Sequence, residues 1–209
     1  MMCFERIRRA LSALLLAAAT LVGPGIPDVR AEPAAYRVDP DHSQIGFLVD
    51  HIGFARVLGK FTDVSGEYTF DEAAPSVSGL RIVVRTESVW TGHAERDAHL
   101  RGKDFLDVAR FPEMVFVGRR AEATGPRTGR VEGDLTLLGQ TRPVTLDVTW
   151  NKSGRYPFGG GLLGAPNYVT GISARGSIRR SEFGMTYAVE NGWVGDKVDL
   201  ILEVEAIRQ

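Results

Sequence analysis

The stretch Arg130–Trp150, RVEGDLTLLGQTRPVTLDVTW, contains two runs in which apolar and polar residues alternate. In a β-strand successive side chains point to opposite faces, so each run predicts a strand with one apolar and one polar face. Leu138-Gly139-Gln140-Thr141 separates the runs and is typical of a tight hairpin. The stretch therefore predicts two neighbouring antiparallel strands, buried on one side and wetted on the other.

The same alternation recurs along most of the chain. Further alternating runs are HSQIGFLVDH (42–51), SGLRIVVRTES (78–88), GISARGSI (171–178) and KVDLILEVEA (197–206). Two less regular strands are expected over 60–70, where Gly66 is a candidate bulge or close-approach point, and over 114–120. About eight strands without a long amphipathic helix predict an all-β protein, in which the sheet closes into an antiparallel barrel or folds into a sandwich. An eight-stranded barrel has room for one small ligand.

Several positions in the inward-facing set carry small side chains. These are Gly133, Ala174, Gly176 and Ala206. Small residues there either leave a cavity or let neighbouring segments approach closely. The alternation alone leaves both interpretations open.

The first 31 residues have the pattern of a secretory signal. Three arginines within residues 6–9 precede an apolar run, Ala10–Val22, and Val29-Arg30-Ala31 offers a small-residue cleavage site. A membrane anchor is the alternative, but the run is shorter than the about 20 residues that span a bilayer comfortably. We therefore expect residues 1–31 to be removed and residues 32–209 to form one domain. Cys3, the only cysteine, would leave with the signal.

The charge of the expected mature chain limits its partners. Without residues 1–31, Lys and Arg fall from 25 to 21 and Asp and Glu from 26 to 24, so the formal net charge is −3. A mildly acidic domain without a basic run argues against nucleic acid as a partner. It also argues against a surface that clings to anionic lipid.

One segment departs from the strand pattern. TGHAERDAHLRGKDFLDVARFPEM (91–114) is rich in charged residues and ends near Pro112. Residues 96–106 are the plausible helical part, and Gly102 interrupts them, so we expect two short helices. Their apolar side chains would plug one end of the barrel.

Histidine and acid pairs in the chain raise the question of a metal or catalytic site. The four histidines show no HxH or HxxxH spacing, so hydrogen bonding is a better interpretation than a metal centre, and no cofactor is expected. An enzyme would pair Asp97 with His99 and use a nucleophile such as Ser43. The chain has no Gly-x-Ser-x-Gly elbow and no phosphate-binding glycine loop. We expect instead that His42 and Ser43 tie the first strand and that Arg96, Asp97 and His99 pin the helical segment.

Several motifs follow one another in a specific order. They are YRVDPDHSQIGFLVDHIG (36–53), GKFTDVSGEYTFD (59–71), RDAHLRGKDFLDVARFPEMVF (96–116), VEGDLTLLGQTRPVTLDV (131–148), SARGSIRRSEFGM (173–185) and VGDKVDLILEVEA (194–206). Together they resemble the YceI family of lipocalin-like, polyisoprenoid-binding proteins over residues 36–206. Two departures are Phe105-Leu106, where the family often has two aromatics, and the glycine-rich loop near Gly159–Gly161.

The resemblance implies a lipocalin-like barrel with short helices closing one end and an elongated apolar tunnel. The tunnel would hold an isoprenoid lipid, such as a polyprenyl phosphate or an isoprenoid quinone, and the protein would work in the periplasm. By alternation phase, the wall candidates are Ile45, Phe47, Val49, Phe61, Ile82, Val84, Phe116, Leu135, Leu146 and Ile172; Leu100 and Phe105 are candidates on the helical segment, and Trp90 is a candidate for wall or hinge.

The remaining expectations concern surface charge and partners. Arg175 is out of phase with the inward-facing residues of its strand and is expected to face solvent. Arg179 and Arg180 either meet a phosphate head group or only nearby acids, and solvated charge is the expectation because surface arginines are common. Transient contact with a membrane or a membrane redox protein is a further expectation, with the chain a monomer or homodimer. The alternatives to a lipid carrier are an enzyme acting on a lipid-like substrate and a scaffold for a membrane redox protein.

Overall fold

The structure is a computed structural model that describes residues 32–159 and 165–209, and these described residues form one compact unit. The expected signal segment, and Gly160 and Gly161 of the glycine-rich loop, lie outside the described residues. Within the described part, the helices are all too short or too polar to cross a membrane.

The described residues form eleven strands and few helical turns. The strands are β1 (Ala34–Val38), β2 (Gln44–His51), β3 (Ala55–Phe61), β4 (Val64–Asp71), β5 (Ser76–Arg85), β6 (Val89–Trp90), β7 (Glu113–Ala123), β8 (Thr128–Leu137), β9 (Gln140–Arg155), β10 (Tyr168–Arg179) and β11 (Val194–Arg208). The helical elements are α1 (Ala94–Arg101) and the 3-10 turns η1 (Pro40–His42), η2 (Thr86–Ser88) and η3 (Arg180–Phe183).

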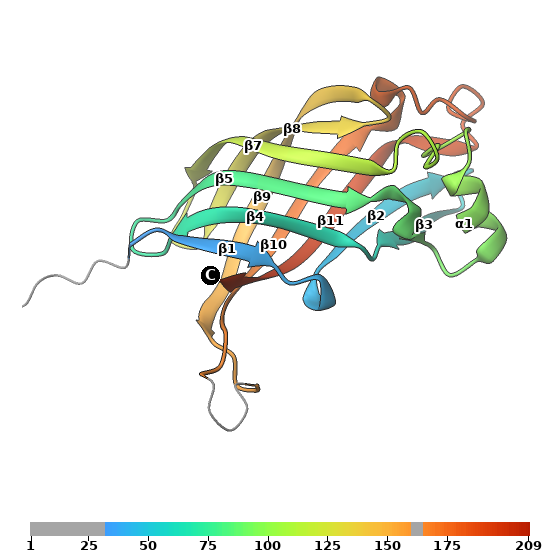
Figure 1. Ribbon diagram of the computed structural model, residues 1–209. Coiled ribbons are helices and arrows are strands. Elements are labelled where there is room, and N and C mark those ends of the chain that lie inside the picture. Colours follow the sequence, from blue (N-terminus) through green and yellow to red (C-terminus); the bar gives the residue numbers. More distant parts are fainter. Residues whose placement is uncertain (1–31, 160–164) are drawn as a thin grey trace, which may run out of the picture. The chain divides into compact units, whose positions relative to one another are not determined.

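Eight of these strands close into an antiparallel barrel (Figure 1). Their order is β1-β4-β5-β7-β8-β9-β10-β11, and β11 pairs back with β1. The long strand β11 pairs with β1 through Ala206–Arg208 and with β2 through residues 194–203. The strands β2, β3 and β6, paired in that order beyond β11, therefore extend the sheet past the closed ring. The prediction of an eight-stranded antiparallel barrel is confirmed, with three additional strands on its rim.

Two local predictions have different outcomes. The hairpin is confirmed: β8 and β9 are joined by Leu138 and Gly139, which have φ angles of 52° and 71°. The prediction of a single strand over 60–70 is wrong, because Thr62 and Asp63 separate β3 from β4. Ser88 Oγ accepts the backbone N–H groups of both residues at that break, at 3.2 and 3.1 Å.

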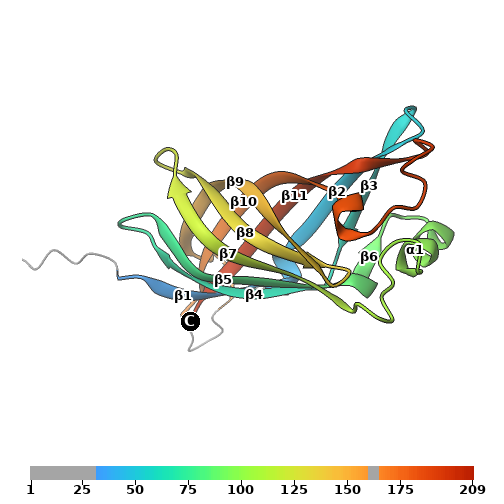
Figure 2. The same ribbon diagram turned by 90° about the horizontal axis from the view of Figure 1, so that it is seen from above.

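The helical segment lies at one end of the barrel (Figure 2). The helix α1 begins after His93, whose Nδ1 accepts the Arg96 N–H, and ends at Gly102, whose N–H donates to the His99 carbonyl. The expected break at Gly102 is confirmed. The expected second helix is wrong, because residues 103–110 form consecutive turns. Those turns still carry Phe105 and Leu106 into the core.

Candidate ligand-binding cavity

The barrel contains an apolar cavity of about 510 Å³. This volume lies within the roughly 300–1,000 Å³ that is typical of small-molecule sites. Its walls come from the inward faces of the strands and from α1 with the turns that follow it. Because the walls are almost wholly aliphatic and aromatic, the cavity is suited to a hydrocarbon ligand.

The structure places twelve of the thirteen candidate residues on the cavity wall. They are Ile45, Phe47, Val49, Phe61, Ile82, Val84, Leu100, Phe105, Phe116, Leu135, Leu146 and Ile172. Trp90 is the exception. It pairs with Lys60 next to the Val89–Phe61 pair, so alternation turns Val89 inward and Trp90 outward. Its side chain is exposed, and Lys60 Nζ lies 5.4 Å from its ring centroid.

Small residues shape the wall by letting aromatic rings lie over them. The ring of Phe47 occupies the space that a Cβ on Gly59 would need, and Phe116 does the same over Gly133. A Cβ on Gly66 would lie 2.6 Å from Ile82 Cδ1 and 2.5 Å from the Arg81 carbonyl oxygen, so close approach is confirmed there. Ala174 lines the cavity, whereas Ala206 packs against the barrel's second apolar cluster. The small residues therefore have both roles that the sequence allowed: they border the cavity, and they let neighbouring segments approach closely.

A second aromatic cluster adjoins the cavity, and its Tyr68 lines the cavity wall. Tyr36 and Tyr68 stack with ring centroids 5.5 Å apart, and Phe70 and Ala206 complete the buried cluster. Burial raises the pKa of Tyr36 to about 12, and hydrogen bonding to Glu72 adds to the shift. Burial also raises the pKa of Tyr68 far above its usual value. Both phenols are therefore neutral at physiological pH.

Four basic side chains line the cavity. They are His51 of β2, Arg96 and His99 of α1, and Arg180 of η3. The expectation that Arg180 is solvated is wrong: the residue is 2% exposed. Burial lowers the pKa of Arg180, and the Asp196 charge opposes that effect.

Arg180 is buried because it holds the following loop together. Its Nε and Nη atoms donate to the carbonyls of Gly195 (2.8 Å), Met185 (2.9 Å), Tyr187 (2.8 Å) and Val194 (2.7 Å). Four backbone acceptors thus compensate for the lost hydration of the guanidinium. The arginine fixes both ends of the segment that runs from η3 to β11.

A polar network pins α1 beside the cavity. Asp97 is buried, and its Oδ1 accepts the N–H of Thr91 at 2.8 Å and the Thr91 hydroxyl. Arg96 Nε donates to Thr91 Oγ1 at 2.7 Å. His99 Nε2 instead pairs with Asp104 Oδ2 at 2.9 Å. The predicted structural network is confirmed, and the Asp97–His99 pair that an enzyme would need is not formed.

His42 and Ser43 connect the start of the chain to β11. Ser43 Oγ donates to the Glu205 carbonyl and accepts the Glu205 N–H, both at 3.1 Å. His42 Nδ1 lies 2.9 Å from Asp39 Oδ2, and that hydrogen bond raises the pKa of His42. Asp39, His42 and Glu205 offer ligand atoms within 4.8 Å of one another, although histidine spacing gave no sign of such a group. The hydrogen bonds confirm that His42 and Ser43 tie this region together.

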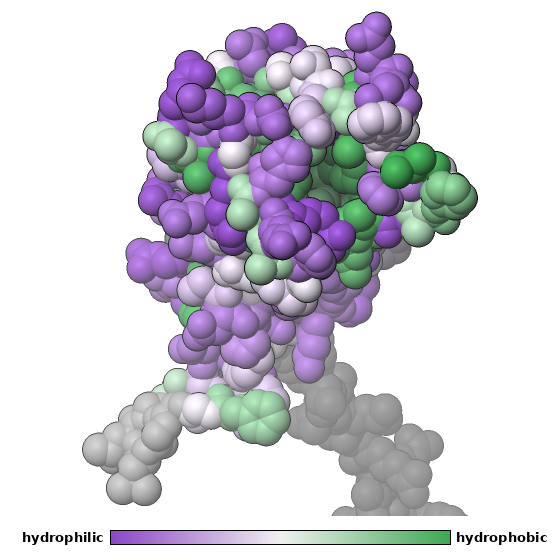
Figure 3. Space-filling view, turned by 90° about the vertical axis from the view of Figure 1, so that its right-hand side faces the viewer, coloured by the Kyte–Doolittle hydropathy of each residue, from purple (hydrophilic) through white to green (hydrophobic). Residues whose placement is uncertain are grey.

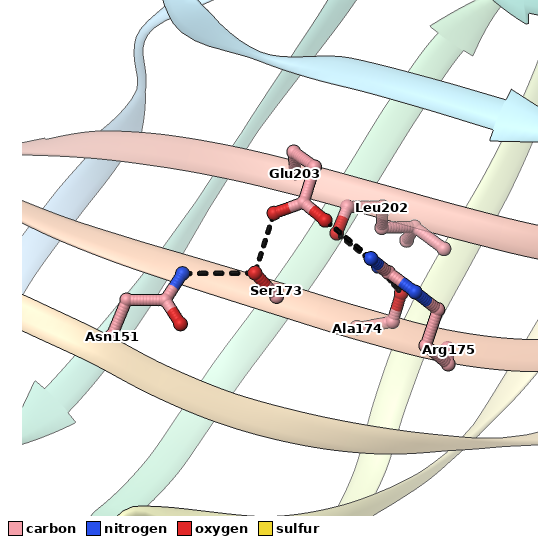
Figure 4. A network of polar contacts seen from close by, with 6 residues as sticks. All are labelled: Asn151, Ser173, Ala174, Arg175, Leu202 and Glu203. Carbon is pink, nitrogen blue, oxygen red and sulfur yellow. Dashed lines mark hydrogen bonds and ion pairs between the residues drawn. The ribbon is translucent and has the colours of Figure 1, made fainter.

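A polar network crosses the outer face of β9, β10 and β11 (Figure 4). Asn151 on β9 donates to Ser173 Oγ on β10, and Ser173 donates to Glu203 on β11. Arg175 Nη2 lies 2.6 Å from Glu203 Oε1 and is exposed, as predicted. Partial burial alone would raise the pKa of Glu203. The hydrogen bonds from Ser173 and Arg175 outweigh that effect, so the pKa is lowered. The cavity is therefore the apolar side of strands whose other side faces water.

Sequence reasoning missed the residues at the cavity's open edge. Ile52, Tyr187 and Trp193 line the cavity and are also partly exposed. They lie in loops, where alternation gives no signal. The apolar residues in the turn after HSQIGFLVDH and beside Gly192 were the available clue.

A closed antiparallel barrel with an apolar cavity and a helical segment at one end defines a lipocalin-like protein. The chain belongs to the YceI family: the model of the YceI-like domain matches residues 36–206. It is 34% identical over 205 residues to a UPF0312 protein of Pseudomonas putida (strain W619), covering 97% of this chain and 99% of the relative.

Two solved structures share the fold. The YceI protein of Campylobacter jejuni matches with a TM-score of 0.67 and 28% identity, over 77% of this chain and 90% of that one. A polyisoprenoid-binding domain from Saccharophagus degradans matches with a TM-score of 0.61 and 14% identity, over 84% and 99%.

Proposed function

We propose that this protein binds the tail of a long isoprenoid lipid in its barrel cavity and stores or carries that lipid. The observation that carries the proposal is the apolar cavity of about 510 Å³, lined by strands and by α1. The family supports it, as does the structural neighbour from Saccharophagus degradans, which is described as a polyisoprenoid-binding domain. The twelve wall residues named above are the proposed contacts.

The driving force follows from the chemistry of the walls. Each methylene that moves from water into an apolar cavity contributes about 0.8 kcal/mol. A hydrocarbon tail with many such groups binds without any directed hydrogen bond. Selectivity would then come from the width of the cavity, to whose walls Phe47 and Phe116 contribute by lying over glycines.

The head group would lie at the open edge. Arg96 lines the cavity there, is exposed, and within residues 32–159 and 165–209 makes no ion pair with a carboxylate. Such a cation favours a head group rich in oxygen acceptors. A polyprenyl phosphate and an isoprenoid quinone both meet that requirement. The N-terminal signal pattern supports action in the periplasm.

The test fills the cavity without touching the polar exterior. Ala174 faces the cavity, whereas Ser177 on the same strand is exposed on the outer face. In Ala174→Phe the new ring takes up cavity space, so retention of an isoprenoid quinone added in detergent should fall at least about tenfold. Ser177→Phe adds the same ring outside and should retain the quinone normally. Equal retention by the two folded variants would contradict binding in the cavity.

A further inference from the structure

Three large apolar residues belong both to the cavity wall and to the exposed surface. Ile52 is 48% exposed, Tyr187 43% and Trp193 58%, and all three line the cavity. Phe54, two residues after Ile52, is 90% exposed. We call these four residues the mouth lip. Figure 3, which views the end of the barrel that carries α1, shows hydrophobic side chains gathered around a hollow and projecting beside it.

The mouth lip is one connected surface. Ile52 and Phe54 lie in the turn between β2 and β3, and Tyr187 and Trp193 lie in the loop that Arg180 holds. The backbone N–H of Ile52 donates to the Trp193 carbonyl at 3.1 Å, which joins the two loops. The ring of Tyr187 also contacts α1, with its centroid 5.2 Å from that of His99. The lip is therefore held in place by backbone and side-chain contacts.

Folding alone does not explain an isoleucine at position 52. Ile52 and Gly53 have φ angles of 55° and 72°, and the Phe54 N–H donates to the His51 carbonyl, as in a type I′ turn. That turn favours Asn or Gly first, and a β-branched residue there costs about 1–3 kcal/mol. Leu138 has a similar φ of 52°, but its side chain packs on the main core. Ile52 is outside that core and lies half-exposed at the cavity's edge, so the cost points to a role at the surface.

Charges beside the mouth lip are balanced. Arg56, next to the β2–β3 turn, pairs with Asp199 at 2.7 Å, and Lys197 pairs with the same carboxylate at 2.7 Å. The extra positive charge on that carboxylate is offset by the exposed Glu190 in the loop between Tyr187 and Trp193. Arg179 pairs with Asp196 at 3.3 Å. Paired charges give little attraction to an anionic surface. They suit the zwitterionic head groups of a neutral bilayer, where Trp and Tyr are favoured at the interface.

We infer that the mouth lip inserts into the interfacial layer of a neutral phospholipid bilayer. Phe54 and Ile52 enter the acyl boundary, and Trp193 and Tyr187 lie at the level of the head groups. The lip is continuous with the cavity wall, so a lipid tail passes from bilayer to cavity along an apolar surface. This inference goes beyond ligand binding, because docking requires the lip but no particular cargo.

The test compares two exposed phenylalanines in the full chain. Phe54→Ser removes the most exposed lip residue and leaves the cavity wall intact, whereas Phe158→Ser removes a phenylalanine that is 74% exposed in the segment after β9. Each protein is mixed with phosphatidylcholine vesicles, and backbone hydrogen exchange is followed by mass spectrometry. Reading exchange by position separates the lip from any membrane contact made by the N-terminal apolar run.

Vesicles should slow exchange at residues 51–56 and 187–194 of the wild type and of Phe158→Ser. In Phe54→Ser, the vesicle concentration that gives half of this protection should rise about tenfold or more. High salt should leave the vesicle concentration for half protection of the wild type unchanged. Absence of protection at the lip in the wild type, or equal protection in Phe54→Ser, would overturn the inference. Lip protection in a protein that carries no isoprenoid would leave docking standing and contradict only the proposed function.

Discussion

Tyr36 and Tyr68 stack in parallel, with ring centroids 5.5 Å apart and planes 11° apart, but their hydroxyl groups differ. The Tyr36 hydroxyl donates to Glu72 Oε1 at 2.7 Å. The Tyr68 hydroxyl is buried and has no hydrogen-bond partner among the described residues. One phenol of the pair is therefore satisfied, and the other bears a desolvation cost.

This difference predicts opposite effects of the same substitution. Tyr68→Phe removes a buried, unpaired hydroxyl, so the free energy of unfolding should stay equal or rise by about 1 kcal/mol. Tyr36→Phe removes a hydrogen bond to a carboxylate and should lower it by about 1–2 kcal/mol. Urea unfolding of the two variants measures both. A larger loss in Tyr68→Phe than in Tyr36→Phe would show that the Tyr68 hydroxyl has a partner.

Gly59 should not tolerate a side chain. A Cβ there would overlap the ring of Phe47, so Gly59→Ala must displace the ring from its place in the cavity wall. We expect a loss of about 1–3 kcal/mol in stability, together with altered ligand retention. Gly154→Ala is the matched control, because its Cβ would meet only Lys152 Cε at 3.8 Å. Thermal unfolding distinguishes them, and equal melting temperatures would contradict the close packing.

Arg180 should be far more important for stability than its neighbour. Arg180→Ala leaves four backbone carbonyls without their donor, so we expect a loss of at least about 3 kcal/mol and faster hydrogen exchange over residues 185–195. Arg179→Ala breaks only an exposed ion pair with Asp196 and should cost less than about 1 kcal/mol. Similar costs for the two variants would mean that Arg180 does not organise the loop.

His42 should make stability depend on pH. The hydrogen bond to Asp39 raises the pKa of His42 above 6.5, its value in the unfolded chain. The folded state therefore holds the proton more tightly, and this contribution is full below pH 6.5 and lost as pH rises through the folded pKa.

The measurement is the free energy of unfolding of the wild type and His42→Ala across that range. The difference between them should shrink as pH rises. Asp39→Asn is the control, because the amide oxygen still accepts the Asp41 N–H but the carboxylate charge on His42 is gone. The dependence should weaken strongly in Asp39→Asn, where only the charges of Glu205 and Asp41 still raise the pKa of His42, and an unchanged dependence would assign the titration to another group.

The barrel was predictable because alternating apolar and polar residues along its strands show which face of each strand is buried. Each inward position of β8, from Val131 to Leu137, alternates with a polar one, and most of β10 and β11 follows the same pattern, with Ile201 on the outer face as an exception. That phase placed Leu135, Leu146 and Ile172 correctly on the cavity wall. The rim strands were not predictable in this way. The strand β6 has only two residues, too few to show a period, so the sequence left Trp90 as a candidate for wall or hinge, and the structure places it off the cavity wall.

The cavity's open edge was beyond sequence reasoning for a different physical reason. Arg180 looked like a surface charge, since four backbone carbonyls rather than an acidic side chain satisfy it. Backbone acceptors carry no signal in the sequence. Ile52 and Trp193 lie in two different loops, which are joined by one backbone hydrogen bond from the Ile52 N–H to the Trp193 carbonyl. Such long-range contacts follow from the closed barrel and not from local pattern.

The most direct test of the proposed function is to identify what the protein holds. The chain is expressed in a Gram-negative host, purified without detergent, shown to be folded by circular dichroism, and extracted with organic solvent for mass spectrometry. The account predicts one isoprenoid lipid, near one equivalent per chain in the wild type and strongly reduced in Ala174→Phe. An extract of folded wild-type protein without isoprenoid, together with no uptake of added isoprenoid quinone, would contradict it.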